Sequence, residues 1–346
     1  MIREHGGIMS ANGDILDFSV NLNPLGMPEA VRRAVTEAAD KWENYPDPFC
    51  TELSEMISLS ENVSANNIVC GNGADDLIYR TVHAFKPKNA VVTAPAFGEY
   101  TKALAEAGSA VREHILREHD DFLPDEGFLD TLTPGTDMAF ICSPNNPTGQ
   151  IVPSGLLEAA AKKCRENGIL LVCDECFLSF AENSAERSIS RYMNGNIIIL
   201  RSFTKLYCMA GLRLGYAVCG SADIAEKLRR SGQYWSVSAP AQAAGIAALN
   251  ENTYAAKTVS LIKRERGFLS RQLSALGFGV FPSAVNYILF KGEEGLDDRL
   301  LAEGIGIRSC ESYSGLGRGF YRTAVRTHEE NIKLIKALER CKYVKG

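Results

Sequence analysis

Short apolar runs recur along the first 240 residues, and each one ends in a distinctive polar segment. This pattern restricts the possible folds more than any other feature of the chain. The runs span residues 90–94, 138–142, 169–173 and 197–200. Near-continuous apolar runs of this length are typical of strands buried on both faces of a parallel sheet. Helix-length segments such as 98–107 and 154–167 lie between them, so the order predicts right-handed βαβ units.

The polar segments follow the predicted strands directly. In an open parallel sheet, ligands bind outside the carboxyl ends of the strands. We therefore expect four segments that are far apart in sequence to converge on one site. They are 71–76, 143–149, 174–177 and 202–205.

The pattern changes after about residue 240. A long helical stretch from 241 to about 276 precedes short strand-like runs, and a last helix is predicted from about Glu329. Runs of short strands flanked by helices are typical of an α+β unit. For the 346 residues we predict an N-terminal arm (1–30) that joins the small domain, a large domain (31–240) and a small C-terminal domain (241–346).

Composition excludes several classes of protein. With 45% hydrophobic and 23% charged residues, wholesale disorder is excluded, and a net charge of -5 gives no basic face for nucleic acid. No run approaches the roughly 18 apolar residues of a membrane-spanning helix, and the N-terminus lacks the apolar run of a signal peptide. We expect a cytoplasmic protein without a membrane or nucleic-acid partner. Its ten scattered cysteines are predicted to be reduced thiols, with no metal site.

Lys205 is the first candidate for chemistry. It follows a predicted buried strand and is flanked by the hydroxyls of Ser202 and Thr204, with Arg213 eight residues later. Hydroxyls and a guanidinium can hold a phosphate, while the lysine amine can form a Schiff base with an aldehyde. This context favours a phosphate-bearing aldehyde cofactor, although a lone lysine is usually a solvated surface residue.

Three further segments fit the same cofactor. Asp174 ends a buried strand, where it could pair with a pyridinium nitrogen or cap a helix. Glycines at 71 and 73 open a predicted helix, whose N-terminus could bind phosphate or simply form a turn. The segment 143–149 (Ser-Pro-Asn-Asn-Pro-Thr-Gly) fixes a turn that can direct an asparagine amide toward a ligand.

Arg322 and Arg326 lie four residues apart in a strand-like run. Strand periodicity places both on one face, which is either solvated or recognises anions. About 13 Å separates them along an extended strand, so they need not bind one anion.

Together these residues resemble the fold-type I enzymes dependent on pyridoxal 5'-phosphate (PLP), specifically the class I/II aminotransferase superfamily. The resemblance covers about residues 15–340 and implies an α/β fold with a mostly parallel central sheet between helices, plus a smaller α+β domain. It also implies a homodimer and a role for each matching residue. Lys205 would form the Schiff base, Asp174 would pair with the pyridine nitrogen, Asn146 would bind the ring hydroxyl and Tyr100 would stack on the ring. Gly73, Ala74, Asp75, Ser202, Thr204 and Arg213 would surround the phosphate, Tyr45 would reach the partner subunit's cofactor, and Arg322 would bind the substrate carboxylate.

Two branches of the superfamily compete: the threonine-phosphate decarboxylases of cobalamin biosynthesis and the histidinol-phosphate aminotransferases. The opening His5-Gly6-Gly7 with the segment 17–26 resembles the decarboxylases. So do Phe177, where the aminotransferases usually carry tyrosine, and the second arginine in 321–327. Ser238 replaces a family asparagine. The resemblance implies a phosphorylated amino-acid substrate, with His5, Asn23, Asn146, Arg322 and Arg326 as candidate contacts.

The catalytic set itself does not separate decarboxylation from transamination, because the orientation of the substrate decides which bond breaks. A cofactor-binding module without turnover is the competing class of function. The intact Lys205, Asp174, Asn146 and Arg322 argue against it.

Overall fold

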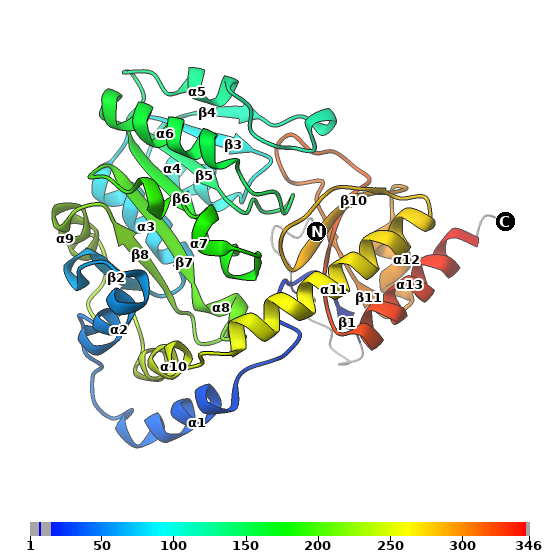
Figure 1. Ribbon diagram of the computed structural model, residues 1–346, viewed down its shortest axis with the longest axis horizontal. Helices are drawn as coiled ribbons and strands as arrows, with labels where there is room; N and C mark the ends of the chain where they lie inside the picture. Colours follow the sequence, from blue (N-terminus) through cyan, green and yellow to red (C-terminus); the bar gives the residue numbers. More distant parts are fainter. Residues whose placement is uncertain (1–6, 8–14, 344–346) are drawn as a thin grey trace.

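The computed structural model describes Gly7 and residues 15–343, and it divides into a larger and a smaller lobe (Figure 1). The larger lobe is organised around a seven-stranded sheet in the order β2-β8-β7-β6-β5-β3-β4. Only β8 runs antiparallel to its neighbours. The strands are β2 (Ile68–Gly71), β3 (Asn89–Ala94), β4 (Ala110–Ile115), β5 (Met138–Cys142), β6 (Leu170–Asp174), β7 (Ile197–Ser202) and β8 (Gly215–Cys219).

Both faces of this sheet are buried. In β6, Leu170 and Val172 pack into one hydrophobic cluster, while the alternate residues Leu171 and Cys173 pack into another. The predicted doubly covered sheet is confirmed. The helices of this part are α1 (Glu29–Glu37), α2 (Thr51–Glu61), α3 (Ala74–Phe85), α4 (Glu99–Glu106), α5 (Gly127–Thr131), α6 (Ser154–Asn167), α7 (Ser184–Arg187), α8 (Phe203–Leu206), α9 (Ala222–Arg230) and α10 (Ala239–Leu249).

The smaller lobe contains a four-stranded antiparallel sheet in the order β12-β13-β10-β9. The strand β1 (Leu16–Asp17) pairs in parallel with β11 (Ile305–Gly306), so the N-terminal segment lies beside C-terminal elements. The other elements are α11 (Tyr254–Ala275), β9 (Gly279–Val280), β10 (Tyr287–Lys291), α12 (Leu296–Ala302), β12 (Arg308–Ser309), β13 (Phe320–Ala324) and α13 (His328–Tyr343). The predicted fold class is confirmed.

Two expected elements are wrong. The stretch 241–276 is two helices, α10 and α11, separated by 250–253, where asparagines favour a turn over a helix. Ser238, which replaces a family asparagine, caps α10 by accepting a hydrogen bond from the Ala241 N–H at 3.4 Å. The strand predicted over 321–326 ends at Ala324, so Arg326 lies outside it.

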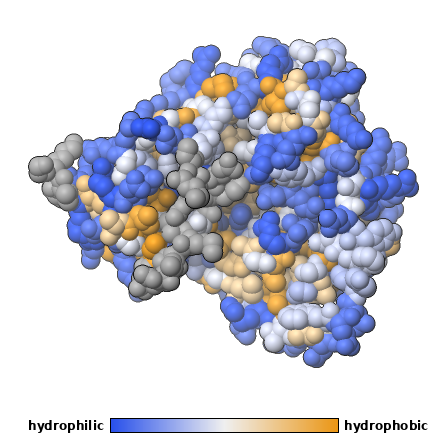
Figure 2. Space-filling model, turned by 180° about the vertical axis from the view of Figure 1, so that it is seen from behind, coloured by the Kyte–Doolittle hydropathy of each residue, from blue (hydrophilic) through white to orange (hydrophobic). Residues whose placement is uncertain are grey.

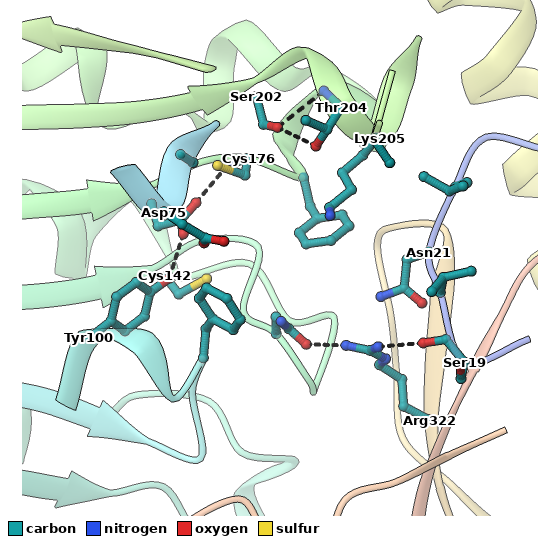
Figure 3. Close-up of a pocket in the computed structure, with 18 of the residues that line it drawn as sticks. Ser19, Asn21, Asp75, Tyr100, Cys142, Cys176, Ser202, Thr204, Lys205 and Arg322 are labelled. Atoms are coloured by element: carbon teal, nitrogen blue, oxygen red, sulfur yellow. Dashed lines mark hydrogen bonds between the residues drawn. The ribbon is translucent and has the colours of Figure 1, made fainter. Parts of the chain in front are cut away.

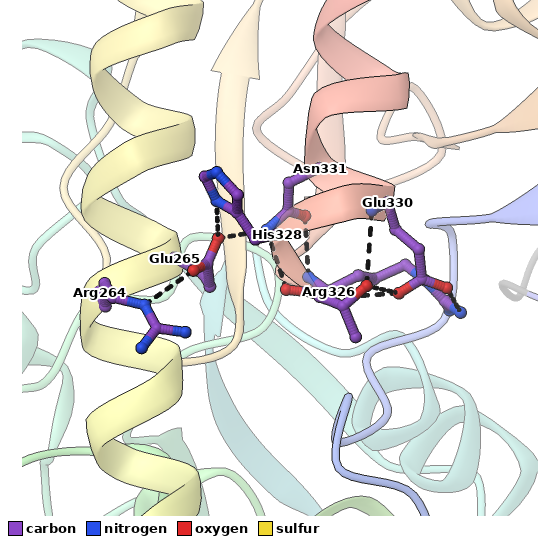
Figure 4. A network of polar contacts seen from close by, with 7 residues as sticks. Arg264, Glu265, Arg326, His328, Glu330 and Asn331 are labelled. Atoms are coloured by element: carbon purple, nitrogen blue, oxygen red, sulfur yellow. Dashed lines mark hydrogen bonds and ion pairs between the residues drawn. The ribbon is translucent and has the colours of Figure 1, made fainter.

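The predicted domain boundary at 240 stays a prediction. Helix α10 begins next to this boundary and packs against α1 and α2. The polar contacts in Figure 4 lie between α11 and α13, where the buried carboxylate of Glu265 accepts hydrogen bonds from Arg264 at 2.9 Å and Asn331 at 3.2 Å. His328 Nδ1 lies 2.9 Å from the same carboxylate. These contacts fasten the last helix of the chain to α11.

The surface and the thiols add two observations. Hydrophilic residues predominate around the outline of the face shown in Figure 2, with apolar residues between them. None of the helices in the described residues is both long and apolar enough to cross a membrane. The ten cysteines are all free, and nine of them are buried.

Candidate active site

A cavity of about 340 Å³ lies at the carboxyl ends of the central strands (Figure 3). The four polar segments expected to converge all contribute to its wall, so that prediction is confirmed. The N-terminal segment and the smaller lobe close its other side. Its lining includes Ser19, Val20, Asn21, Leu22, Ala74, Asp75, Phe97, Tyr100, Cys142, Asn146, Asp174, Cys176, Phe177, Ser202, Thr204, Lys205, Ala210, Arg213, Tyr313 and Arg322.

Lys205 enters this cavity from α8, the short helix that follows β7. Burial lowers the pKa of its amine, and the nearby Arg213 and Arg322 lower it further, against the opposing effect of Cys176 and Asp75. The amine nitrogen lies 6.0 Å from the centre of the Phe177 ring. A lowered pKa increases the neutral fraction of the amine, which is the form that attacks an aldehyde.

Asp174 is held at the end of β6 by two donors. Its Oδ2 accepts from the Tyr100 hydroxyl at 2.5 Å, and its Oδ1 accepts from the Cys176 N–H at 2.9 Å. The carboxylate is 6% exposed and borders the cavity. The two donors fix the orientation of the carboxylate, a group that can pair with a pyridinium nitrogen.

This geometry does not favour the predicted stacking role of Tyr100. Its ring is 1% exposed and stacks on Phe140, with centroids 5.1 Å apart, while its hydroxyl is committed to Asp174. Phe97 lies edge-on to Tyr100 and is the more exposed of the two rings on the cavity wall. We therefore assign Tyr100 to the orientation of Asp174 and propose Phe97 as the ring that stacks on the cofactor.

The opposite end of the cavity is built for an anion. Ala74 and Asp75 begin α3, whose first N–H groups carry partial positive charge. Arg213 lies there with its Nη2 3.5 Å from the Asp75 carboxylate. The hydroxyls of Ser202 and Thr204 lie 2.7 Å apart beside it. All five residues border the cavity.

Gly73 allows Arg213 to approach this helix end. Its φ is +87°, and a Cβ at this position would lie 2.6 Å from Arg213 Nη2. Asp76 supports the same loop from behind, because its carboxylate accepts from the Asn72 N–H at 2.9 Å and pairs with Arg80 at 2.8 Å. A side chain at residue 73 would displace the guanidinium or strain the backbone.

Arg322 projects from β13 into the side of the cavity formed by the smaller lobe. It donates to Asn146 Oδ1 and to the Ser19 carbonyl, the latter at 2.9 Å. Asn21, with its amide oxygen turned toward the guanidinium, accepts from Nε at 3.3 Å. In the described residues all these acceptors are neutral, and Arg322 is 5% exposed. A buried cation without a carboxylate partner favours binding of an anionic ligand group.

Three of the predicted contacts, Asn23, Arg326 and Tyr45, lie outside the cavity wall. The Asn23 amide is buried and donates to Leu206 O at 2.8 Å and Thr258 Oγ1 at 2.7 Å, so it holds the N-terminal segment. Arg326 pairs with Glu330 at 2.6 Å and donates to the Asp17 carbonyl at 3.1 Å (Figure 4). Its predicted place on the same strand face as Arg322 is wrong, because β13 ends at Ala324. Tyr45 is 79% exposed and stacks on Trp235 outside the cavity. His5 lies outside the described residues.

Two cavity residues, and one residue next to the cavity wall, were missed at the sequence level. Ser19 and Asn21 are small polar residues with no motif of their own. Arg308 was also missed, although the register of the small sheet places it directly opposite Arg322. It is 4% exposed and lies over the ring of Tyr313. An arginine in a short strand of an α+β unit was the only available signal, and the pairing with Arg322 depends on the tertiary fold.

These residues fit PLP. The cavity joins an amine with a lowered pKa, a carboxylate held by two donors, and a helix N-terminus with an arginine that only glycine at 73 leaves room for. Among the described residues, no cluster of potential ligands suggests a metal ion. The fold and the site define a PLP-dependent enzyme.

Comparison with known proteins identifies the family. The family model for aminotransferase class I and II matches residues 13–338. Threonine-phosphate decarboxylase of Salmonella typhimurium is 37% identical over 97% of this chain and 94% of its own length. Histidinol-phosphate aminotransferase of Methanosarcina mazei is 34% identical over 94% of this chain and 88% of its own.

A solved structure agrees with these matches. The histidinol-phosphate aminotransferase of Clostridium acetobutylicum superimposes with a TM-score of 0.88 at 27% identity, covering 94% of this chain and 98% of that one. The chain belongs to the aminotransferase class I and II family, its fold is the fold-type I architecture, and its cofactor is PLP.

Proposed function

We propose that this enzyme decarboxylates L-threonine O-3-phosphate to (R)-1-aminopropan-2-yl phosphate, a reaction of cobalamin biosynthesis. The observation that carries the proposal is the facing pair Arg308 and Arg322 on β12 and β13. The Cα atoms of directly opposite residues in antiparallel strands lie about 4.5–5.5 Å apart, and the two side chains share a face of the sheet. Threonine phosphate carries its carboxylate and phosphate on adjacent carbons, and this spacing suits two neighbouring guanidinium groups.

The two arginines receive separate roles. Arg322 borders the cavity and hydrogen-bonds Asn146, so we assign it the carboxylate. Arg308 contacts Tyr313, another cavity residue, and we assign it the phosphate in place of Arg326. The Gly7 N–H donates to Ser19 Oγ at 2.8 Å, which brings the described part of the N-terminus to a cavity residue. His5 therefore stays a candidate for the phosphate.

The protein groups divide the chemical work. When bound, PLP supplies an aldehyde for the substrate amine and a ring that accepts the electron pair of the breaking Cα bond. Asp174 would pair with the pyridine nitrogen and favour its protonated form. Arg322 holds the carboxylate so that the Cα–carboxylate bond, rather than the Cα–H bond, is the one that breaks as CO2 leaves. Lys205 then returns a proton to Cα, and its lowered pKa suits this proton transfer.

The alternative is an aminotransferase of the histidinol-phosphate type, with amino transfer between histidinol phosphate and the glutamate/2-oxoglutarate pair. The relative from Methanosarcina mazei supports it, and the same Lys205, Asp174, Asn146 and Arg322 would serve. Histidinol phosphate carries only one anionic group, so the facing arginines favour threonine phosphate. Glutamate carries two, which keeps this alternative open.

The test supplies purified holoenzyme with L-threonine O-3-phosphate and no keto acid, and CO2 release is measured. Release at catalytic rates, lost with unphosphorylated L-threonine, is the expected result. No release, together with amino transfer from histidinol phosphate once 2-oxoglutarate is added, would assign the aminotransferase activity instead. If the protein holds PLP but shows neither activity, the result would favour a cofactor-binding module.

We also propose a cytoplasmic homodimer in which Tyr45 reaches the partner's cofactor phosphate. Tyr45, Phe49, Tyr234 and Trp235 form an exposed aromatic cluster. Exposed apolar clusters of this kind mark contact surfaces. The proposal predicts a mass of two chains by light scattering, and weaker PLP binding in Tyr45→Ala than in the wild type. A monomer that binds PLP as tightly would contradict it.

A further inference from the structure

Two charged residues stand next to the cofactor-binding residues of β6 and β7 and form an ion pair away from the cavity. Glu175 follows Asp174, and Arg201 precedes Ser202. Side chains alternate between the two faces of a strand, so neighbours of cofactor-facing residues face the other way. Arg201 Nη2 lies 2.9 Å from Glu175 Oε2, and neither residue lines the cavity. The Glu175 side chain is 0% exposed and that of Arg201 is 16% exposed.

The pair closes the end of the two strands. The Glu175 N–H donates to the Leu200 carbonyl at 2.9 Å, which continues the β6–β7 pairing by one residue. Beyond Arg201, the Glu175 carboxylate accepts from the Ser188 hydroxyl at 2.8 Å and the Ile189 N–H at 2.7 Å. Both carboxylate oxygens of Glu175 are thus bound, Oε1 by the Ile189 N–H and Oε2 by Ser188 and Arg201.

Arg201 extends the network to the neighbouring elements. Its Nη2 also lies 3.6 Å from Glu61 at the end of α2, and the Glu61 carboxylate accepts from the Tyr216 hydroxyl of β8 at 2.5 Å. Burial raises the pKa of Glu175 while Arg201 opposes that rise. Arg201 of β7 therefore contacts the carboxylate that follows β6 and the one at the end of α2, and the second of these accepts from Tyr216 of β8.

Stability alone does not explain such a pair. The cost of removing both charges from water offsets much of their attraction, and apolar residues of similar size often replace a buried ion pair without loss. The position of this pair points to a geometric role. Glu175 follows Asp174, the residue assigned to the pyridine nitrogen, and Arg201 precedes Ser202, whose hydroxyl is assigned to the phosphate.

We propose that Glu175 and Arg201 are positioning residues for PLP. Their ion pair sets the separation between Asp174 and Ser202, and so the fit of the cofactor between its ring nitrogen and its phosphate. The inference requires only the cofactor, so it holds for either reaction considered above.

The test measures PLP binding in Glu175→Gln, Arg201→Met and the double variant. We expect each single variant to raise the dissociation constant of PLP at least about tenfold, because one buried charge is left without its partner. The double variant removes both charges and should recover part of that loss. The pH at which the visible absorption band of bound PLP changes should also shift in the single variants, since Asp174 then moves relative to the ring.

A matched control lies between α11 and α13. Glu265 is as well buried as Glu175 and also pairs with an arginine, Arg264, but belongs to the separate network of Figure 4. Glu265→Gln should lower the melting temperature without changing PLP affinity or the absorption titration. If Glu175→Gln behaves like this control, the pair is structural only and the proposal fails.

Two other results would also overturn the proposal. A double variant no better than either single variant would show that the attraction between Glu175 and Arg201 does not matter. If Glu175→Gln does not fold, Ser188→Ala removes one hydrogen bond from the same carboxylate, and unchanged PLP binding there would count against the proposal. If the wild-type enzyme binds PLP normally but does not turn over threonine phosphate, only the proposed reaction is refuted.

Discussion

Two ends of one cavity are assembled in different ways. At the cofactor end, Asp174 and Ser202 stand at the tips of the adjacent strands β6 and β7, and Lys205 follows three residues later. At the substrate end, Arg322 of β13 is held by acceptors from the N-terminal segment and from the loop after β5. The first end depends on one sheet, whereas the second depends on how three separate segments meet.

This difference in assembly predicts how substitutions at each end will act. Strand pairing fixes the cofactor residues before any ligand is present, and buried ion pairs support them from behind. Among the residues that the structure describes, the partners of the Arg322 guanidinium are neutral acceptors, so its charge is available for a ligand. Substitutions at the two ends should therefore fail in different ways.

The largest effect is expected for Lys205→Ala, which removes the amine that bonds the cofactor and moves the proton. Turnover should fall by at least about 10²–10⁴-fold, the usual contribution of general acid–base catalysis alone. The circular dichroism spectrum should match the wild type, because α8 tolerates alanine. Full activity in this variant would overturn the whole assignment.

A smaller effect is expected for Arg322→Gln at the substrate end. Losing one charged partner of a buried contact costs about 2–5 kcal/mol, roughly 30- to 5,000-fold in kcat/KM. PLP content should be unchanged, which distinguishes this end from the other. The matched control is Arg326→Gln, whose partners are Glu330 and the Asp17 carbonyl, and whose kcat/KM should change far less. Equal losses in both variants would contradict the separate roles.

The difference between the two ends also explains which site residues could be predicted from the sequence. Asp174, Ser202, Lys205 and Arg213 were found because each belongs to a short motif next to an apolar strand, and local patterns encode strand ends. Strands β2 and β4 were not identified. The edge strand β4 alternates polar residues such as Arg112 and His114 with apolar ones and lacks a continuous apolar run.

The substrate end could not be read in the same way. Arg326 was paired with Arg322 by counting along a strand that stops two residues earlier. The residue that does face Arg322 is Arg308, which is 14 positions away and is brought there by antiparallel register. Tyr100 was expected to stack on the cofactor, because only the tertiary structure shows that its ring is stacked on Phe140.

Gly73→Ala tests the phosphate end of the cofactor region. The new Cβ would lie 2.6 Å from Arg213 Nη2 at a φ of +87°. Backbone strain of this kind costs about 1–3 kcal/mol, so the dissociation constant of PLP should rise roughly 5- to 150-fold. Gly98→Ala is the control, because no atom lies within 4 Å of its Cβ position and its φ is ordinary. Unchanged PLP binding in Gly73→Ala would argue against a role for Arg213 at the phosphate.

The smallest expected effect concerns pH and again separates the two ends. Burial depresses the pKa of Lys205 in the folded protein, while the unfolded chain titrates near the ordinary value of about 10.4. Between these two pKa values the unfolded state binds more protons, so the stability of the PLP-free enzyme should rise with pH across this window. Each unit of depression corresponds to about 1.4 kcal/mol.

Lys205→Met removes this titration and should flatten the dependence of the unfolding free energy on pH over that range. Arg322→Gln should leave the slope unchanged, because a guanidinium stays protonated throughout. Denaturant unfolding of the PLP-free variants at several pH values measures the slopes directly. If the wild type and Lys205→Met show the same slope, the amine is not buried as the cofactor end requires. The reactivity of the Lys205 amine toward PLP would then depend on the bound cofactor rather than on burial in the protein.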